Sequence, residues 1–220
     1  METEDPTTET VRVPRQRGWF ARLWRILIEP RAEWAVIETE ADSIRELMLR
    51  WVAPLSAIGP VAKLIGEQLF GYNDYGADLR PPIETALTEA VVSYLLSLGA
   101  AYLLARMISA LATYFGGREH RTRAMKVAAY GATAAYLAGG FQIVPPLQWI
   151  GAVGLYSLYL IFTGLPALMH VTRRKALTFT VVTLLAAIGL SIAVMIGVML
   201  SKDAFTPEFP DAAYNYTPPE

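Results

Sequence analysis

The feature that most constrains this chain is a series of apolar runs, each about as long as a membrane-crossing helix. A transmembrane helix needs about 20 predominantly apolar residues. Five such runs occur, at residues 51–70, 86–115, 126–144, 147–169 and 176–200. Charged residues make up 18% of the chain, below the roughly 25% of soluble domains. The sequence therefore predicts an all-α polytopic membrane protein, with five transmembrane helices in a domain over residues 50–200.

The distribution of Lys and Arg supports five crossings and predicts their orientation. Cytoplasmic segments near membrane spans carry an excess of these basic residues. Residues 1–50 carry eight arginines, loop 116–126 carries four basic residues and loop 170–175 three, whereas segments 71–85 and 201–220 carry one each and turn 145–148 none. The alternation is lost unless the first run crosses the membrane. We expect a multi-pass protein of a cell inner membrane, with a cytoplasmic N-terminus and an external, periplasmic C-terminus.

The two ends of the chain differ from the apolar middle. Residues 1–17 are polar and lack the pattern of a signal peptide, so we expect a disordered tail. Residues 201–220 form an acidic external tail rich in proline. Residues 18–49 are expected to form cytoplasmic interfacial helices, interrupted at Pro30, because proline ends or kinks a helix.

An amphipathic helix is predicted at the start of this interfacial region. Trp19 and Trp24 fall on one helical face, whereas Arg22 and Arg25 lie largely on the other. Tryptophans opposite arginines are typical of a helix that lies among lipid headgroups, which makes membrane lipids a predicted partner. A helix packed onto the cytoplasmic end of the bundle would explain the same pattern.

Small residues recur at four-residue spacing in several of the runs, and two of these stripes contain glycine. Helices in lipid associate by close packing of such residues, because burying leucine away from lipid gains little. One stripe is Gly131, Ala135 and Gly139, and the other is Gly189, Ala193 and Gly197. Both stripes predict helix packing, either inside one bundle or at a homodimer seam.

Three ionisable residues in the first two runs form a candidate polar site inside the membrane. Lys63 and Glu67 are one helical turn apart and share a helix face. Glu89, near the outer end of the second run, is expected at a similar depth. A charge inside the bilayer costs roughly 3 kcal/mol on insertion scales. Lys63 and Glu67 are therefore either a self-satisfied ion pair facing the bundle or part of a hydrated cavity near the outer leaflet.

The sequence offers little for catalysis. The chain has no cysteine and only two histidines, and neither histidine has a partner at metal-ligand spacing. No glycine-rich phosphate loop and no set of serine, histidine and carboxylate residues is present. We therefore expect no enzymatic activity, no metal and no cofactor. The formal net charge of −1 gives no reason to expect nucleic acid as a partner.

Four stretches resemble the Yip (Ypt-interacting protein) domain family in its prokaryotic branch. They are EPRAEW, WVAPLSAIGPVAKLIG, KVAAYGATAAYLAGGFQIVPPL and LYSLYLIFTGLPALMHVTRRKA, and the resemblance extends over roughly residues 20–200. It implies five spans and a cytoplasmic N-terminus. Eukaryotic members associate with prenylated Rab GTPases, but their acidic-Leu-Tyr-Gly-Pro motif is absent here, where the chain has SIRELMLRWVAP. The resemblance therefore implies neither GTPase binding nor catalytic residues.

Three functions are compatible with these patterns. The first is a non-enzymatic membrane scaffold or adaptor of the Yip-domain type, acting in membrane organisation or trafficking, with a second copy or other membrane proteins as partners. The second is a small ion or solute transporter or channel that uses Lys63 and Glu67. The third is a lipid-binding, membrane-remodelling protein that acts through the tryptophan–arginine helix.

Overall fold

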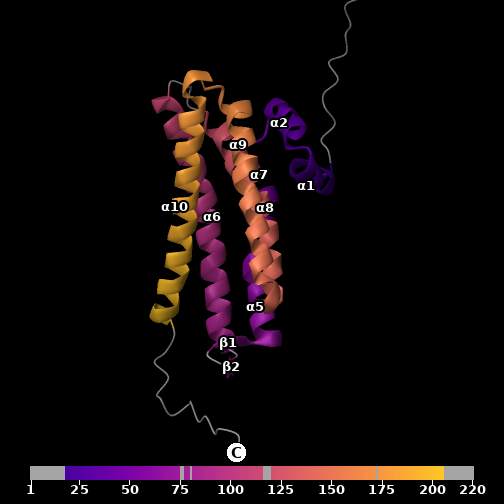
Figure 1. The fold of residues 1–220 in the computed structure, drawn as a ribbon, viewed down its shortest axis with the longest axis vertical. Helices are drawn as coiled ribbons and strands as arrows, with labels where there is room; N and C mark the ends of the chain where they lie inside the picture. Colours follow the sequence, from indigo (N-terminus) through magenta and orange to yellow (C-terminus); the bar gives the residue numbers. More distant parts are fainter. Residues whose placement is uncertain (1–17, 75–76, 80, 116–119, 172, 206–220) are drawn as a thin grey trace, which may run out of the picture.

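Long helical segments run side by side along the molecule, with two short helices at one end and a β-hairpin at the other (Figure 1). The computed structural model describes residues 18–74, 77–79, 81–115, 120–171 and 173–205. The predicted disordered tail 1–17 and most of the predicted acidic tail lie outside these residues. Residues 201–205 belong to the last helix.

The two N-terminal helices form a platform at one end of the bundle. Helix α1 spans Trp19–Ile28 and helix α2 spans Pro30–Thr39. Pro30 is the first residue of α2, a position where its missing N–H leaves no helical hydrogen bond unmade. The break expected at Pro30 is therefore present. We refer to α1 and α2, residues 19–39, as the platform.

The first lengthwise segment is a helix of mixed geometry. It comprises α3 (Ile44–Leu47), the π-helical turn η1 (Met48–Val52), α4 (Ala53–Ser56) and α5 (Ile58–Phe70). A capping box starts it, since Ser43 Oγ accepts from the Glu46 N–H at 3.2 Å and Glu46 Oε2 accepts from the Ser43 N–H at 3.1 Å. Pro54 cannot donate a backbone hydrogen bond, and the π-helical turn directly before it accommodates this defect.

The remaining segments pass back and forth along the bundle. After α5, strands β1 (Tyr72–Asp74) and β2 (Ala77–Leu79) pair antiparallel. The other lengthwise segments are α6 (Ile83–Tyr114), then α7 (Arg121–Gly131), α8 (Thr133–Ala138) and the 3-10 helix η2 (Gly139–Ile143), then the 3-10 helix η3 (Pro145–Leu155) and α9 (Tyr156–Met169), and finally α10 (Arg173–Phe205).

Four described segments are long and apolar enough to cross a membrane: Ile44–Phe70, Ile83–Tyr114, Pro146–Met169 and Lys175–Ser201. The predicted run 126–144 is not among them, so five crossings stay a prediction. Its physical setting differs from that of the others. Every residue from 124 to 131 is buried, so α7 lies in the interior of the bundle. A helix shielded by its neighbours does not need an apolar surface against lipid.

Aromatic side chains fill the bundle near the platform. Trp34 of α2 is fully buried and donates its indole N–H to Thr163 Oγ1 at 3.2 Å. Trp51 of η1 is also buried and donates to Thr133 Oγ1 at 3.0 Å. Tyr130 contacts both indoles, with ring centroids 6.3 Å from Trp34 and 4.7 Å from Trp51. These contacts fix the platform and three lengthwise segments against one another.

The two small-residue stripes have different surroundings. A Cβ atom at Gly131 would lie 2.6 Å from Ile161 Cγ1, and one at Gly139 would lie 2.7 Å from the Gly59 Cα. Gly131 and Gly139 therefore allow close approach of other helices. Ala135, between them, is exposed and lines a cavity.

In the second stripe, Gly189 and Ala193 are exposed. A Cβ atom at Gly197 would lie 3.1 Å from Leu96 Cδ1. The first stripe thus packs mainly inside the bundle, whereas two members of the second face outward. A homodimer seam at these outward residues stays a prediction.

Candidate functional site

The three predicted intramembrane charges lie together in the structure, and we call Lys63, Glu67 and Glu89 the Lys63 cluster. The Lys63 ammonium forms an ion pair with Glu89, and it lies 3.5 Å from Glu67 Oε1. Side-chain exposure is 30% for Lys63, 16% for Glu67 and 9% for Glu89. The Lys63 cluster therefore joins α5 to α6 through largely enclosed charges.

The chain reversal after α5 places these residues at the same depth. Lys63 lies seven residues before the end of α5, and Glu89 lies six residues after the start of α6. At 1.5 Å per helical residue, both are about 10 Å from the hairpin end of the bundle. Glu67 is four residues beyond Lys63 on the same helix face. The i, i+4 spacing was visible in the sequence, whereas the pairing with Glu89 requires the antiparallel return of α6.

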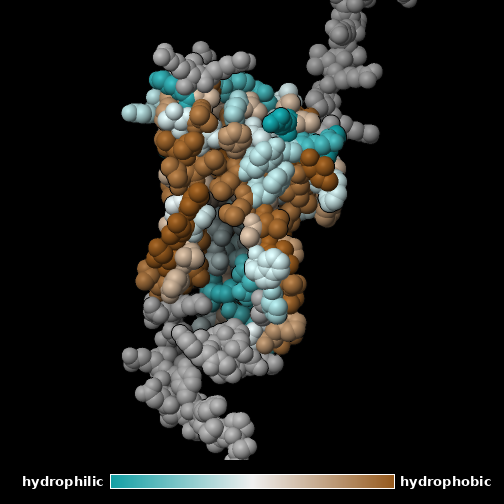
Figure 2. All heavy atoms as spheres, in the orientation of Figure 1, coloured by the Kyte–Doolittle hydropathy of each residue, from teal (hydrophilic) through white to brown (hydrophobic). Residues whose placement is uncertain are grey.

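A cavity of about 170 Å³ adjoins the Lys63 cluster. Its wall includes the small or polar residues Ser56, Gly59, Ser93, Ser97 and Gln142. Figure 2 shows hydrophilic residues at the bottom of a hollow near the hairpin end, between hydrophobic outer walls. The volume is large enough for several water molecules or a small polar group. The charges are therefore paired and also border a cavity, and hydration of that cavity stays a prediction.

A larger groove of about 900 Å³ continues from this cavity. The groove and the cavity share the residues Ser97, Ala135, Tyr136, Gly139 and Gln142. Away from these shared residues, the groove is lined mainly by alanine, glycine and aliphatic side chains from α6, η3, α9 and α10. A polar compartment and an apolar compartment therefore meet inside the helical bundle.

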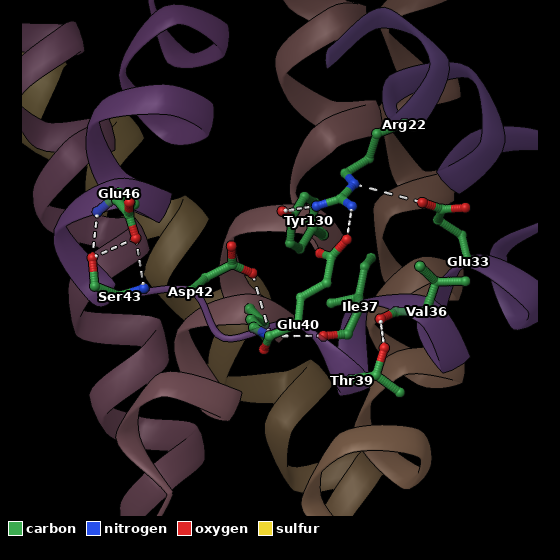
Figure 3. Close-up of polar contacts among 11 residues, drawn as sticks. Arg22, Glu33, Val36, Ile37, Thr39, Glu40, Asp42, Ser43, Glu46 and Tyr130 are labelled. Atoms are coloured by element: carbon green, nitrogen blue, oxygen red, sulfur yellow. Dashed lines mark hydrogen bonds and ion pairs between the residues drawn. The ribbon is translucent and has the colours of Figure 1, made fainter. Parts of the chain in front are cut away.

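A second group of charges, which we call the platform network, joins the platform to the bundle (Figure 3). It consists of Arg22, Glu33, Glu40, Asp42 and Lys126. Arg22 forms an ion pair with Glu40, lies 3.6 Å from Glu33 Oε1, and donates to the Tyr130 hydroxyl at 2.9 Å. Burial alone lowers the pKa of the Arg22 guanidinium, but hydrogen bonds to Glu40 and Tyr130 outweigh it and raise the pKa. Arg22 therefore stays charged at any physiological pH.

Lys126 holds the C-terminal end of α2. Its ammonium donates to the carbonyl oxygens of Ile37 at 2.7 Å and Glu40 at 2.5 Å, and lies 3.3 Å from Asp42 Oδ2. The last carbonyls of a helix have no intrahelical partners and carry partial negative charge. A buried cation from α7 satisfies them here. The sequence reasoning missed this role and counted Lys126 among the loop charges, although its place at the start of an apolar run was a usable signal.

Of the α1 residues expected to face lipid, some pack against the bundle and others are exposed. Trp19 packs on Trp51 with ring centroids 5.5 Å apart and donates its indole N–H to the Arg50 carbonyl at 3.0 Å. Trp24 is 64% exposed. Arg25 is partly exposed and lies 3.3 Å from Glu29.

Arg22 is buried among protein groups, so the expectation that it faces lipid headgroups needs correction. A helical projection shows the side on which Arg22 lies, but it cannot show that the bundle occupies that side. Lipid binding by Trp24 and Arg25 stays a prediction.

A model of the Yip1 domain matches residues 24–195. The chain belongs to the Yip1 domain family. It is similar to the inner membrane protein YohC of Escherichia coli strain K12, with 29% identity over 176 residues, covering 77% of this chain and 89% of YohC. YohC of Escherichia coli O6:H1 strain CFT073 shows the same identity and coverage. No solved structure matches the chain significantly. The family resemblance expected from the sequence is confirmed.

The four stretches that carry the Yip resemblance meet near the platform. EPRAEW supplies Trp34, and the apolar stretches supply its hydrogen-bond partner Thr163, its ring neighbour Tyr130, and Trp51, which contacts Tyr130. A Cβ atom at Gly164 would lie 2.6 Å from ring atoms of Trp34, so this glycine makes room for the indole. In this Yip1 domain, the four stretches therefore hold helices together near the platform. The second stretch also contains Lys63, and the third contains Gln142 of the cavity wall toward the opposite end of the bundle.

Proposed function

We propose that this Yip1-domain protein is a non-enzymatic scaffold or adaptor of an inner membrane, acting in membrane organisation or trafficking. The platform network is the observation that carries the proposal. Buried ion pairs and the Trp34 contacts hold α1 and α2 in one position on the bundle. Phe20 and Trp24 on α1 are 79% and 64% exposed. Because the two helices are held in place, their exposed aromatic side chains form a defined surface that lipid or a neighbouring protein can contact.

Site-specific photo-cross-linking in native membranes tests the scaffold role. A photoreactive amino acid at Phe20 or Trp24 is expected to give a discrete adduct with a second copy or with one reproducible membrane protein. Trp149, which is 76% exposed on η3, is the matched control outside the platform. Absence of any adduct from both platform positions, with folded protein present, would contradict the scaffold proposal.

We further propose that the chain crosses the membrane five times, with the platform in the cytoplasm. The alternating basic residues and the lengthwise course of residues 121–143 support this topology. Because the chain has no native cysteine, single cysteines can report the side of the membrane.

We expect a membrane-impermeant maleimide, applied to the outer face, to label Glu84→Cys and Trp149→Cys. Arg31→Cys and His120→Cys should be labelled only after permeabilisation. If residues 121–143 do not cross, His120→Cys and Trp149→Cys would instead behave alike.

Passage of a small solute is the second candidate function, and the cavity beside the Lys63 cluster favours it. The buried aromatic residues Trp51 and Tyr130 fill the bundle between this cavity and the platform, so passage would require helix movement. In proteoliposomes, the wild type should then show ion or solute flux that Lys63→Met/Glu67→Gln abolishes in equally folded protein. No flux across a broad solute panel would remove this candidate and leave the scaffold.

A further inference from the structure

The cavity of the Lys63 cluster and the adjoining groove form one space with two chemically different halves. One half contains Lys63, Glu67 and Glu89, and the other is lined by residues such as Leu104, Ile161 and Ile188. The shared lining residues place the two halves directly beside each other. Figure 2 shows the hollow open to the outside of the bundle, between hydrophobic walls. A molecule that fills both halves must itself have a polar end and an apolar end.

The dimensions match one leaflet of a bilayer. Glu89 and Leu104 mark the polar and apolar ends along α6, and 15 residues separate them. At 1.5 Å per residue this is about 22 Å. One leaflet with its headgroup layer is roughly 20–22 Å thick. Since the Lys63 cluster lies about 10 Å from the hairpin end, its depth suits a headgroup with acyl chains directed toward the bilayer centre.

The charged residues that line the cavity indicate which polar group a bound molecule would carry there. Among the described side chains that line it, Lys63 is the cation and Glu67 and Glu89 are the anions. This set is complementary to a group with one cationic and one anionic centre. A primary ammonium can donate charge-assisted hydrogen bonds to the carboxylates, whereas a quaternary ammonium has no N–H to donate. A phosphate diester at the same site would lie within reach of Lys63.

We propose that this space binds one phospholipid of the surrounding bilayer whose zwitterionic headgroup carries a primary amine. The ammonium lies against Glu67 and Glu89, the phosphate faces Lys63, and an acyl chain occupies the groove between α6 and α10. This site is separate from the platform on which the scaffold proposal rests. A failed cross-linking experiment and a failed lipid-binding experiment are therefore distinguishable.

Native mass spectrometry of the reconstituted full chain tests the headgroup. The protein is placed in bilayers of equal phosphatidylethanolamine, phosphatidylcholine and phosphatidylglycerol with identical acyl chains, then released into mild detergent. We expect one retained phosphatidylethanolamine per chain, preferred about tenfold over the other two lipids, the factor that one additional charge-assisted hydrogen bond can supply. Equal retention of the three lipids would overturn the proposal without any variant.

Three variants locate the bound lipid. Glu67→Gln should remove the headgroup preference but leave a lipid bound, because Lys63 and Glu89 still pair. Ser191→Phe, in the groove lining of α10, should remove retention of all three lipids. Thr178→Phe is the matched control, since Thr178 is exposed on the same helix and outside the groove lining.

Monodisperse gel filtration and unchanged helical circular dichroism identify folded variants. Equal retention by the two folded phenylalanine variants would overturn the groove assignment. Unchanged headgroup preference in Glu67→Gln would overturn the headgroup assignment. Displacement of the bound lipid by glycerophosphoethanolamine, which lacks acyl chains, would indicate a site for a soluble amine and overturn the lipid proposal.

Discussion

Replacing Lys63 by methionine is expected to destabilise the membrane domain by about 2 kcal/mol. This is below the usual cost of removing one partner from a fully buried ion pair, because the Lys63 side chain is 30% exposed. The substitution leaves Glu67 and Glu89 as two enclosed carboxylates without the ammonium between them. Their mutual repulsion and lost solvation both oppose folding. Unfolding in mixed detergent micelles, followed by circular dichroism, measures the change.

The triple variant Lys63→Met/Glu67→Gln/Glu89→Gln should be more stable than the single variant. Neutral amides cost less to enclose than unpaired carboxylates, and replacing a whole buried ionic group is often close to neutral. Arg50→Met is a suitable control, because the Arg50 side chain is 74% exposed and lies 3.9 Å from Glu46. Exposed pairs contribute about 0–1 kcal/mol. A triple variant as unstable as Lys63→Met would contradict the ionic account.

The three members of the Lys63 cluster could be predicted from the sequence, because their spacing and their positions within the apolar runs indicate which residues lie at one depth. Lys63 and Glu67 are i, i+4 neighbours, and counting residues from the ends of two apolar runs places Glu89 at their level. The ion pair between Lys63 and Glu89 and the cavity beside it depend on tertiary packing. They follow from the return of the chain after α5 and from the close backbone approach of Gly139 to Gly59. The four-residue spacing predicted close packing at Gly139 but did not identify Gly59 as its partner.

The platform network was beyond sequence reasoning for a different physical reason. Hydropathy treats every arginine and lysine as a group that seeks water or lipid headgroups. Arg22 and Lys126 are instead buried, because acidic side chains and helix-end carbonyls from α2 and the following loop surround them. Residues 121–143 show the same limitation, because they carry three basic residues yet include the buried stretch 124–131. A hydropathy scale does not record that burial.

Replacing Lys126 by methionine is expected to release the platform locally. The substitution removes the cation from two carbonyl oxygens at the end of α2 and from Asp42. Methionine fills a similar volume but donates no hydrogen bond. The Glu40 carbonyl and Asp42 then lose the ammonium, and the Ile37 carbonyl keeps only the Glu40 N–H at 3.4 Å. We expect a loss of about 3 kcal/mol, which corresponds to about a hundredfold faster exchange of α2 amide hydrogens.

Hydrogen–deuterium exchange resolved by peptide distinguishes this local release from general destabilisation. Exchange in α1 and α2 should accelerate, while α6 and α10 keep wild-type rates, because neither contributes to the platform network. Arg31→Met, an exposed cation on α2, is the matched control and should leave exchange unchanged. If Lys126→Met left α2 exchange at the wild-type rate, Lys126 would contribute little to the stability of the platform. The Arg22 contacts with Glu40 and Tyr130 and the aromatic contacts of Trp34 would then suffice to hold α2 on the bundle.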